Sequence, residues 1–295
     1  MLTPDLMREV RRLQVRTRRR VDGLFAGQYH TAFKGRGIEF ADVREYEPGD
    51  DIRAIDWNVT ARAGKPFTKR IVEERELTVF LAVDLSASVA FGSVEGARLK
   101  NTIAVETAAV LALAAGSNND RVGLCIFTDR VELLVPPSKG RGHSLRLLRE
   151  LLNFTPRSRG TDIGAALLHL GHVLPRRGTL FVLSDFLSVP GSFETALRML
   201  SRKQEVIALH ITDPRDRTLP NVGLVPARDP ETGTRVMLDT ASRKVRADFE
   251  NAARRRDSDL AAVFARTETD RVVLATERPF LADLVKYFHL RERRR

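Results

Sequence analysis

Three short segments of the sequence place side-chain oxygens beside apolar runs. In LTVFLAVDLSAS the apolar run ends at Asp84, and hydroxyls follow at Ser86 and Ser88. Thr161 stands at the start of a helical pattern in SRGTDIGAAL, and Asp185 follows the apolar run of GTLFVLSDF. Two carboxylates and three hydroxyls, with no histidine or cysteine, suit Mg²⁺ better than Zn²⁺, with Mn²⁺ or Ca²⁺ as alternatives. These five residues are our predicted metal ligands.

The predicted site is poor in negative charge. Two carboxylates with neutral hydroxyls leave a divalent cation short of anionic ligands, and Mg²⁺ readily keeps exchangeable waters. An Asp or Glu of a partner could complete the coordination, which predicts a docking point rather than a reaction centre. The local alternative is that Asp84, Thr161 and Asp185 cap helices while the serines lie in ordinary turns. The order of all three segments, each at the end of an expected core element, favours the metal site.

The elements that would position these side chains are apolar strands alternating with amphipathic helices. Strands are expected at 77–83, 121–127, 131–135, 178–184, 205–212 and 271–276, and helices at 99–115, 143–154, 161–174, 192–203, 242–266 and 279–290. The alternation predicts a doubly wound, mostly parallel α/β sheet flanked by helices, with the strand at 131–135 as its antiparallel edge. Ligands of such sheets bind beyond the carboxyl ends of the strands, near the topological switch point.

We divide the chain into an N-terminal extension (1–76), the α/β domain (77–290) and a basic tail (291–295). Within the extension, residues 4–22 have the apolar spacing of an amphipathic helix. Within the domain, residues 214–240 are expected to form an irregular hairpin region.

The net charge of +11 raises the possibility of a nucleic-acid partner, but its distribution argues against a folded basic face. Residues 1–20 carry +5, residues 291–295 carry +3, and the other 270 residues carry only +3. Nucleic-acid binding through the basic termini is therefore a lesser alternative. A single cysteine, Cys125, lies in an apolar run, where we expect a buried side chain rather than a nucleophile. With no long apolar stretch and no apolar signal region, we expect a cytoplasmic protein without a membrane span.

The three oxygen-bearing segments also resemble a known site. D-L-S-A-S after an apolar strand, followed by G-T-D-I-G and L-S-D, resembles the metal-ion-dependent adhesion site (MIDAS) of von Willebrand factor A domains. The resemblance implies that Ser86, Ser88 and Thr161 coordinate the ion directly. It also implies that Asp84 and Asp185 hold the ion mostly through water.

A second resemblance concerns the segment before the α/β domain. GRGIEFADVREYEPGDDIRAIDWNVTAR, residues 35–62, resembles the signature of the domain-of-unknown-function-58 family. That family pairs this segment with a von Willebrand A-like domain, and its longer members carry N-terminal membrane helices that this chain lacks. The resemblance implies a MoxR-type AAA+ ATPase as partner, in protein complex assembly or chaperone-like maturation.

The signature is rich in charge, and three interpretations of it stay open. Its charges could form ion pairs and caps that fix the extension to the main domain, a recognition surface beside the metal site, or a second metal site. We expect Trp57 to anchor a short amphipathic piece. The candidate recognition or interdomain residues are Glu39, Asp42, Arg44, Asp50, Asp51, Arg53, Asp56 and Trp57.

Two classes of function compete for the predicted site. We favour a non-enzymatic, metal-dependent protein-interaction module. The alternative is a metal-dependent hydrolase or phosphotransferase that uses Asp84 and Asp185. The chain has no phosphate-binding G-x-x-x-x-G-K-[ST] loop and no G-x-S-x-G elbow. Ser86 also replaces the second aspartate that aspartyl-phosphate chemistry requires.

Overall fold

The computed structural model describes residues 26–34, 42–47, 50–52, 55–70, 77–93, 98–174 and 177–294. The amphipathic helix expected at 4–22, and Glu39 and Arg53 of the signature, lie outside the described residues. No helix among the described residues is long and apolar enough to cross a membrane.

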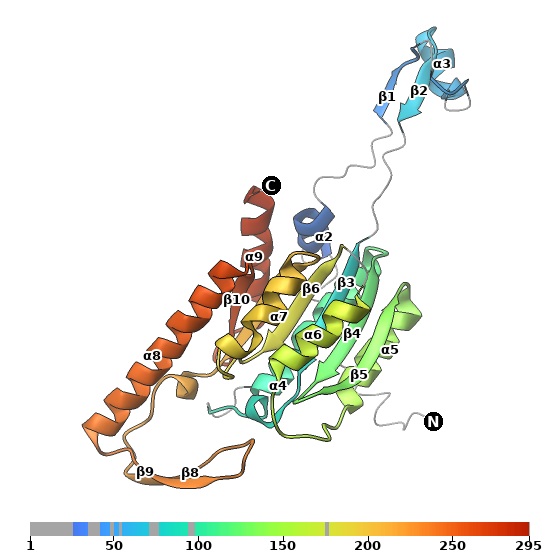
Figure 1. The fold of residues 1–295 in the computed structure, drawn as a ribbon. Helices are drawn as coiled ribbons and strands as arrows, with labels where there is room; N and C mark the ends of the chain where they lie inside the picture. Colours follow the sequence, from blue (N-terminus) through green and yellow to red (C-terminus); the bar gives the residue numbers. More distant parts are fainter. Residues whose placement is uncertain are drawn as a thin grey trace.

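A six-stranded sheet forms the centre of the molecule (Figure 1). The strand order is β10-β7-β6-β3-β4-β5, and every neighbouring pair is parallel except β4–β5. This confirms the predicted fold class and the antiparallel edge strand. The strands are β3 (Thr78–Asp84), β4 (Arg121–Phe127), β5 (Val131–Ser138), β6 (Thr179–Ser184), β7 (Glu205–Thr212) and β10 (Asp270–Ala275).

The central strand β3 explains why its sequence is a continuous apolar run. Val79, Leu81 and Val83 pack into the core on one face of the sheet, whereas Phe80 and Ala82 pack into the core on the other face. A parallel strand covered by helices on both faces needs apolar residues at every position. The chain leaves β3 first toward β4 and β5, and later returns to β6 on its other side. The switch point therefore lies between β3 and β6.

Helices cover both faces of the sheet (Figure 1). One group packs with the first core and the other group with the second. The first group is α2 (Ala26–Lys34), α4 (Lys100–Ser117), α5 (Arg141–Asn153) and α9 (Phe280–Arg294), and the second is α6 (Ile163–Val173), α7 (Gly191–Ser201) and α8 (Arg243–Arg266). Cys125 of β4 is fully buried, as expected, and burial raises the pKa of its thiol to about 12.

The last helix corrects the prediction of a basic tail at 291–295. Residues up to Arg294 belong to α9, and Arg291 is buried. Its guanidinium donates from Nε to the carbonyl oxygen of Ala32 (3.0 Å) and lies 4.6 Å from the ring centroid of Phe33. Both partners belong to α2, so this part of the predicted extension packs on the α/β domain.

Residues 42–70 form a small unit of two antiparallel strands and one helix, which we describe by itself. It contains β1 (Asp42–Glu45), α3 (Trp57–Ala63) and β2 (Phe67–Arg70). The carboxylate of Asp56 caps α3 by accepting from the backbone N–H groups of Asn58 and Val59. Trp57 is 67% exposed, so the expectation that it anchors this segment is wrong.

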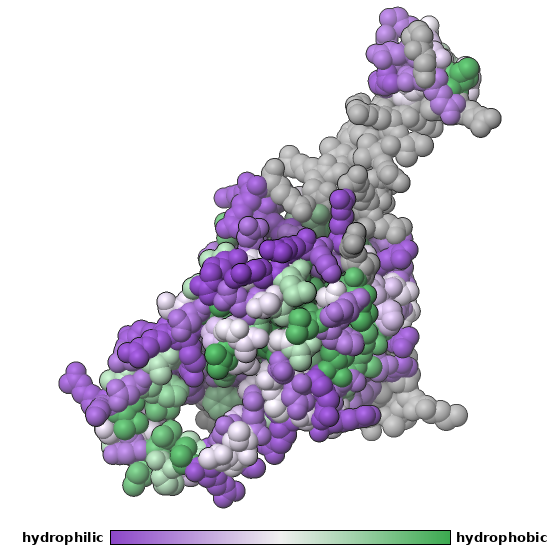
Figure 2. Space-filling view, viewed as in Figure 1, coloured by the Kyte–Doolittle hydropathy of each residue, from purple (hydrophilic) through white to green (hydrophobic). Residues whose placement is uncertain are grey.

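Between β7 and α8 the chain forms a short 3₁₀ turn (Pro214–Asp216) and a regular hairpin. Its strands are β8 (Leu224–Arg228) and β9 (Arg235–Asp239), paired in antiparallel register. The hairpin expected within 214–240 is thus confirmed, and it is more regular than its sequence indicated. Figure 2 shows apolar side chains gathered over this hairpin, where Leu224 and Met237 are well exposed.

Candidate metal centre

The carboxylate of Asp84 lies at the carboxyl end of β3, directly beside the end of β6. It is fully buried. The Ser184 hydroxyl at the end of β6 donates to its Oδ2 at 2.6 Å, and the backbone N–H of Ser86 donates to its Oδ1 at 2.9 Å. Burial, and then the neighbouring charge of Asp185, raise the pKa of Asp84 to about 7. A cation placed here would oppose both effects, because it favours the ionised carboxylate.

Ser86 and Ser88 form the next part of the site. Ser86 precedes a single 3₁₀ turn (Ala87–Val89), and both serine side chains are buried. Their hydroxyl oxygens lie 3.1 Å apart. Neighbouring ligands of an octahedral Mg²⁺, each about 2.1 Å from the ion, are about 3 Å apart. The two hydroxyls are therefore spaced as adjacent ligands of such an ion.

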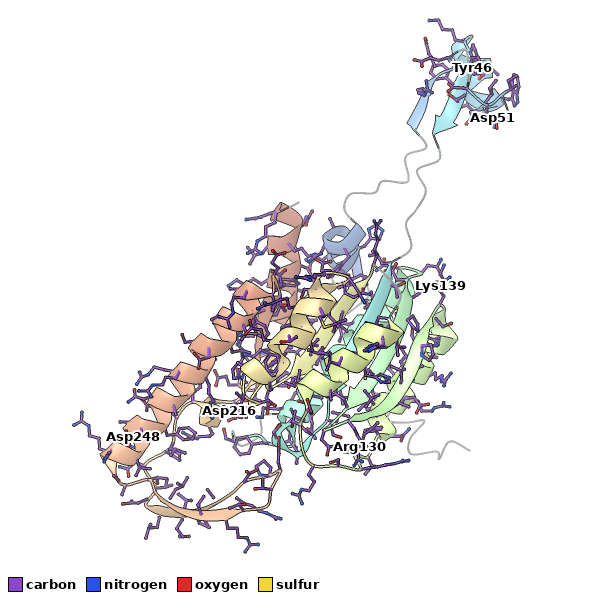
Figure 3. The ribbon with its side chains drawn as sticks, in the orientation of Figure 1. Tyr46, Asp51, Arg130, Lys139, Asp216 and Asp248 are labelled. Atoms are coloured by element: carbon purple, nitrogen blue, oxygen red, sulfur yellow. The ribbon has the colours of Figure 1, made fainter. Side chains whose placement is uncertain are left out.

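Asp185 begins the loop after β6 and contacts a buried lysine. Lys100 Nζ, at the start of α4, lies 2.8 Å from Asp185 Oδ2 and 3.2 Å from Asp216 Oδ1. Burial alone would lower the pKa of Lys100, but the two carboxylates raise it. Burial raises the pKa of Asp216 despite the neighbouring ammonium. In Figure 3, Asp216 and Arg130 mark this edge of the sheet, and Lys139 marks the opposite edge.

Thr161 reaches the site on the loop before α6. The backbone N–H of Ala87 donates to the carbonyl oxygen of Arg159 at 3.0 Å, which fixes this loop against the serine-bearing turn. The Thr161 hydroxyl donates to Glu231 Oε1 at 2.6 Å. Glu231 lies at the tip of the β8–β9 hairpin. The structure thus brings a carboxylate from a distant segment to one of the predicted ligands.

The donor set fits a hard divalent cation. Among the described residues no three histidine, cysteine or acidic side chains form a metal-binding group. Two carboxylates, those of Asp185 and Asp216, contact the Lys100 ammonium group, and the third, that of Asp84, neighbours Asp185. When these three carboxylates and the ammonium group are all ionised, two negative charges stay unbalanced, which favours a bound cation. Burial makes that imbalance costly.

Two ion pairs lie within the small unit. Arg44 Nη2 lies 2.6 Å from Asp50 Oδ1, and Lys65 Nζ lies 3.0 Å from Glu45 Oε1. Asp51 is exposed. A recognition or interdomain role for the candidate residues stays a prediction: Glu39, Asp42, Arg44, Asp50, Asp51, Arg53, Asp56 and Trp57.

Four residues of the site were not predicted from the sequence: Lys100, Ser184, Asp216 and Glu231. Lys100 could have been noticed in the sequence, because a lysine in the first turn of an apolar helix is unfavourable for the helix dipole and so indicates a specific partner. Ser184 lies at the carboxyl end of β6 and Asp216 lies shortly after β7. Both could have been predicted, because ligands of such sheets bind beyond the carboxyl ends of the strands. Glu231 had no signal, because hairpin placement depends on long-range contacts.

The class of protein follows from the sheet order and the oxygen-rich edge. The chain carries an α/β domain with a doubly wound sheet and polar side chains gathered at its switch point. Residues 42–259 match the family model described as "Protein of unknown function DUF58". The chain belongs to this family.

A mycobacterial relative covers nearly the whole chain, and a solved structure shares the fold. "Uncharacterized protein Rv1480" of Mycobacterium tuberculosis is 33% identical over 294 residues, 98% of this chain and 91% of that protein. An aerotolerance-related membrane protein from Bacteroides fragilis has the same fold, with a TM-score of 0.51, 16% identity, and coverage of 74% of this chain and 100% of that one. The SpRpn10 VWA domain is also similar, with a TM-score of 0.40, 11% identity, and coverage of 72% and 95%. The matched family and these relatives indicate no catalytic enzyme family.

Proposed function

We propose that this protein is a non-enzymatic, metal-dependent protein-interaction module. Its fold is of the kind that serves protein interaction, and the proposal adds the chemistry of the site. Five residues at the carboxyl edge of the sheet would hold Mg²⁺, with the serine and threonine hydroxyls as direct ligands and the aspartates nearby. When bound, the ion supplies a Lewis-acidic position for an external carboxylate. The residues are Asp84, Ser86, Ser88, Thr161 and Asp185.

The observation that carries the proposal is the 3.1 Å spacing of the Ser86 and Ser88 hydroxyls beside the buried carboxylate of Asp84. Neutral hydroxyls coordinate a cation without neutralising it, so the site keeps an affinity for anions. Lys100 already pairs with Asp185, which reduces the negative charge available to the ion further. Both features favour capture of an acidic side chain from a partner.

The partner implied by the family resemblance is a MoxR-type AAA+ ATPase. In this proposal the protein links that ATPase to a client during complex assembly or chaperone-like maturation. An acidic side chain on either protein would dock at the metal.

The experiment is an affinity measurement between the full chain and a MoxR-type AAA+ ATPase of the same organism, with Mg²⁺ and with EDTA. We expect binding in Mg²⁺ that is lost in EDTA and in Asp84→Ala. Glu277→Gln is the matched control, because Glu277 is an exposed carboxylate that follows β10 at the same edge of the sheet. Equal affinity in EDTA and in Asp84→Ala would show that docking does not use the metal.

A further inference from the structure

The β8–β9 hairpin is an exposed two-stranded ribbon. Leu224, Val236 and Met237 are 69%, 55% and 63% exposed. An isolated two-stranded ribbon is only marginally stable in water. The hairpin therefore needs contacts elsewhere to hold it, and in Figure 1 it curves beneath the carboxyl edge of the sheet.

The tip of the hairpin has an ordered conformation of its own. The Asp229 carboxylate accepts hydrogen bonds from the backbone N–H groups of Glu231 (2.9 Å) and Thr232 (3.3 Å). Gly233 adopts a φ of 74°, which glycine allows without strain, and its N–H donates to the Asp229 carbonyl oxygen. This turn is built locally, and it holds the Glu231 side chain at the apex.

Two hydrogen bonds join this tip to the predicted metal site. Arg159 Nε donates to the carbonyl oxygen of Pro230 at 3.1 Å, and Thr161 Oγ1 donates to Glu231 Oε1 at 2.6 Å. The loop that carries both donors is itself bonded to the Ser86–Ser88 turn through Ala87. Thr161 is a predicted ligand, and a hydroxyl can donate its proton to a carboxylate while its lone pairs remain free for a cation.

We propose that Glu231 is the acidic ligand of this site in the free protein, supplied by the hairpin of the same chain. The inference rests on the proposed function and answers which carboxylate completes the site before a partner arrives. The hairpin holds the position that a partner's Asp or Glu would take, so a partner must displace it. Asp84, Asp185 and Asp216 belong to the edge of the sheet, whereas Glu231 comes from the tip of an exposed hairpin, so Glu231 is the exchangeable carboxylate.

The test uses Mn²⁺ alone as the probe, on the full chain. Mn²⁺ affinity is measured by calorimetry or by the electron paramagnetic resonance of free Mn²⁺. Hydrogen–deuterium exchange of residues 229–234 is followed with and without the ion. The variants are Glu231→Gln, the control Glu277→Gln, and Asp84→Asn, with circular dichroism to verify folding. Glu231→Gln keeps an acceptor for the Thr161 hydroxyl and removes only the charge.

We expect Glu231→Gln to weaken Mn²⁺ binding at least about tenfold, the lower end of the loss that follows when a hydrogen-bond partner of a metal ligand is changed. We also expect Mn²⁺ to slow exchange at the tip in the wild type and in Glu277→Gln but not in Glu231→Gln. If Glu231→Gln matches the control in both readouts while Asp84→Asn loses Mn²⁺, the inference is overturned and the proposed function stands. If the wild type shows no Asp84-dependent Mn²⁺ binding, both are overturned.

Discussion

The ammonium group of Lys100 lies 2.8 Å from the carboxylate of Asp185, and each side chain exposes only 1% of its surface. This buried pair sits at the point where the chain switches from one half of the sheet to the other. A second carboxylate, Asp216, shares the same ammonium. The site therefore contains a fixed internal cation next to the place where we propose an exchangeable one.

Replacing Lys100 with methionine should destabilise the protein and increase its response to Mg²⁺. The change leaves two buried carboxylates without their partner, which typically costs about 3–5 kcal/mol. It also makes the site more negative, so Mg²⁺ should restore more stability to Lys100→Met than it adds to the wild type. Urea unfolding with and without Mg²⁺ measures both effects.

Lys203→Met is the control, because Lys203 is exposed at the end of α7 and such changes usually stay within about 0.5 kcal/mol. A Lys100→Met protein whose stability is independent of Mg²⁺ would contradict a cation beside Asp185.

His210 should make stability depend on pH between about pH 6.5 and pH 3. Burial and the Arg271 guanidinium lower the pKa of His210 to about 3 in the folded protein. An unfolded histidine titrates near 6.5, so the unfolded chain takes up a proton that the folded chain refuses. Stability contributed by the neutral imidazole is thus present above pH 6.5 and is lost as pH falls toward 3.

The expected loss is about half of 1.4 kcal/mol per pH unit near pH 6.5 and approaches about 1.4 kcal/mol per pH unit near pH 5. Urea unfolding of the wild type and His210→Gln at pH 7, 6 and 5 measures it. The free energy of unfolding of His210→Gln should depend less steeply on pH, because the variant lacks the histidine that takes up a proton on unfolding. Equal slopes in the two proteins would rule out a neutral buried His210 as the cause.

Arg291 should stabilise the fold, unlike an arginine in a solvated tail. It is buried against Ala32 and Phe33 of α2 and forms an ion pair with Glu205. Arg291→Leu should lower the free energy of unfolding by about 2–4 kcal/mol, because it leaves the Ala32 carbonyl and Glu205 without their donor. Arg293→Leu, an exposed position on the same helix, should have little effect. If the two variants unfold alike, the α2–α9 contact does not depend on the guanidinium.

Much of the fold could be predicted because its signals are local. The run Leu77–Val83 predicts a doubly covered strand, and the alternation of strands and helices predicts the parallel sheet. Asp84 and Asp185 were predicted to lie at one edge, because parallel strands end at the same edge of a sheet. Trp57 and Arg291 were assigned wrongly because burial depends on which distant elements pack together. Glu231 could not be found, since its approach to Thr161 joins residues 70 positions apart.

The most direct test of the central claim is a calorimetric titration of Mg²⁺ into the wild type, Asp84→Asn and Ser192→Ala. A fourth protein, Ser86→Ala, removes a predicted ligand. Ser192→Ala is its control for loss of a serine hydroxyl, because the exposed Ser192 hydroxyl donates to the Val189 carbonyl oxygen. The account predicts one Mg²⁺ per chain in the wild type and Ser192→Ala, and weakened or absent binding in Asp84→Asn and Ser86→Ala. Binding of equal strength in all four proteins, or no Mg²⁺ bound by the wild type, would contradict a metal centre at the β3–β6 switch point.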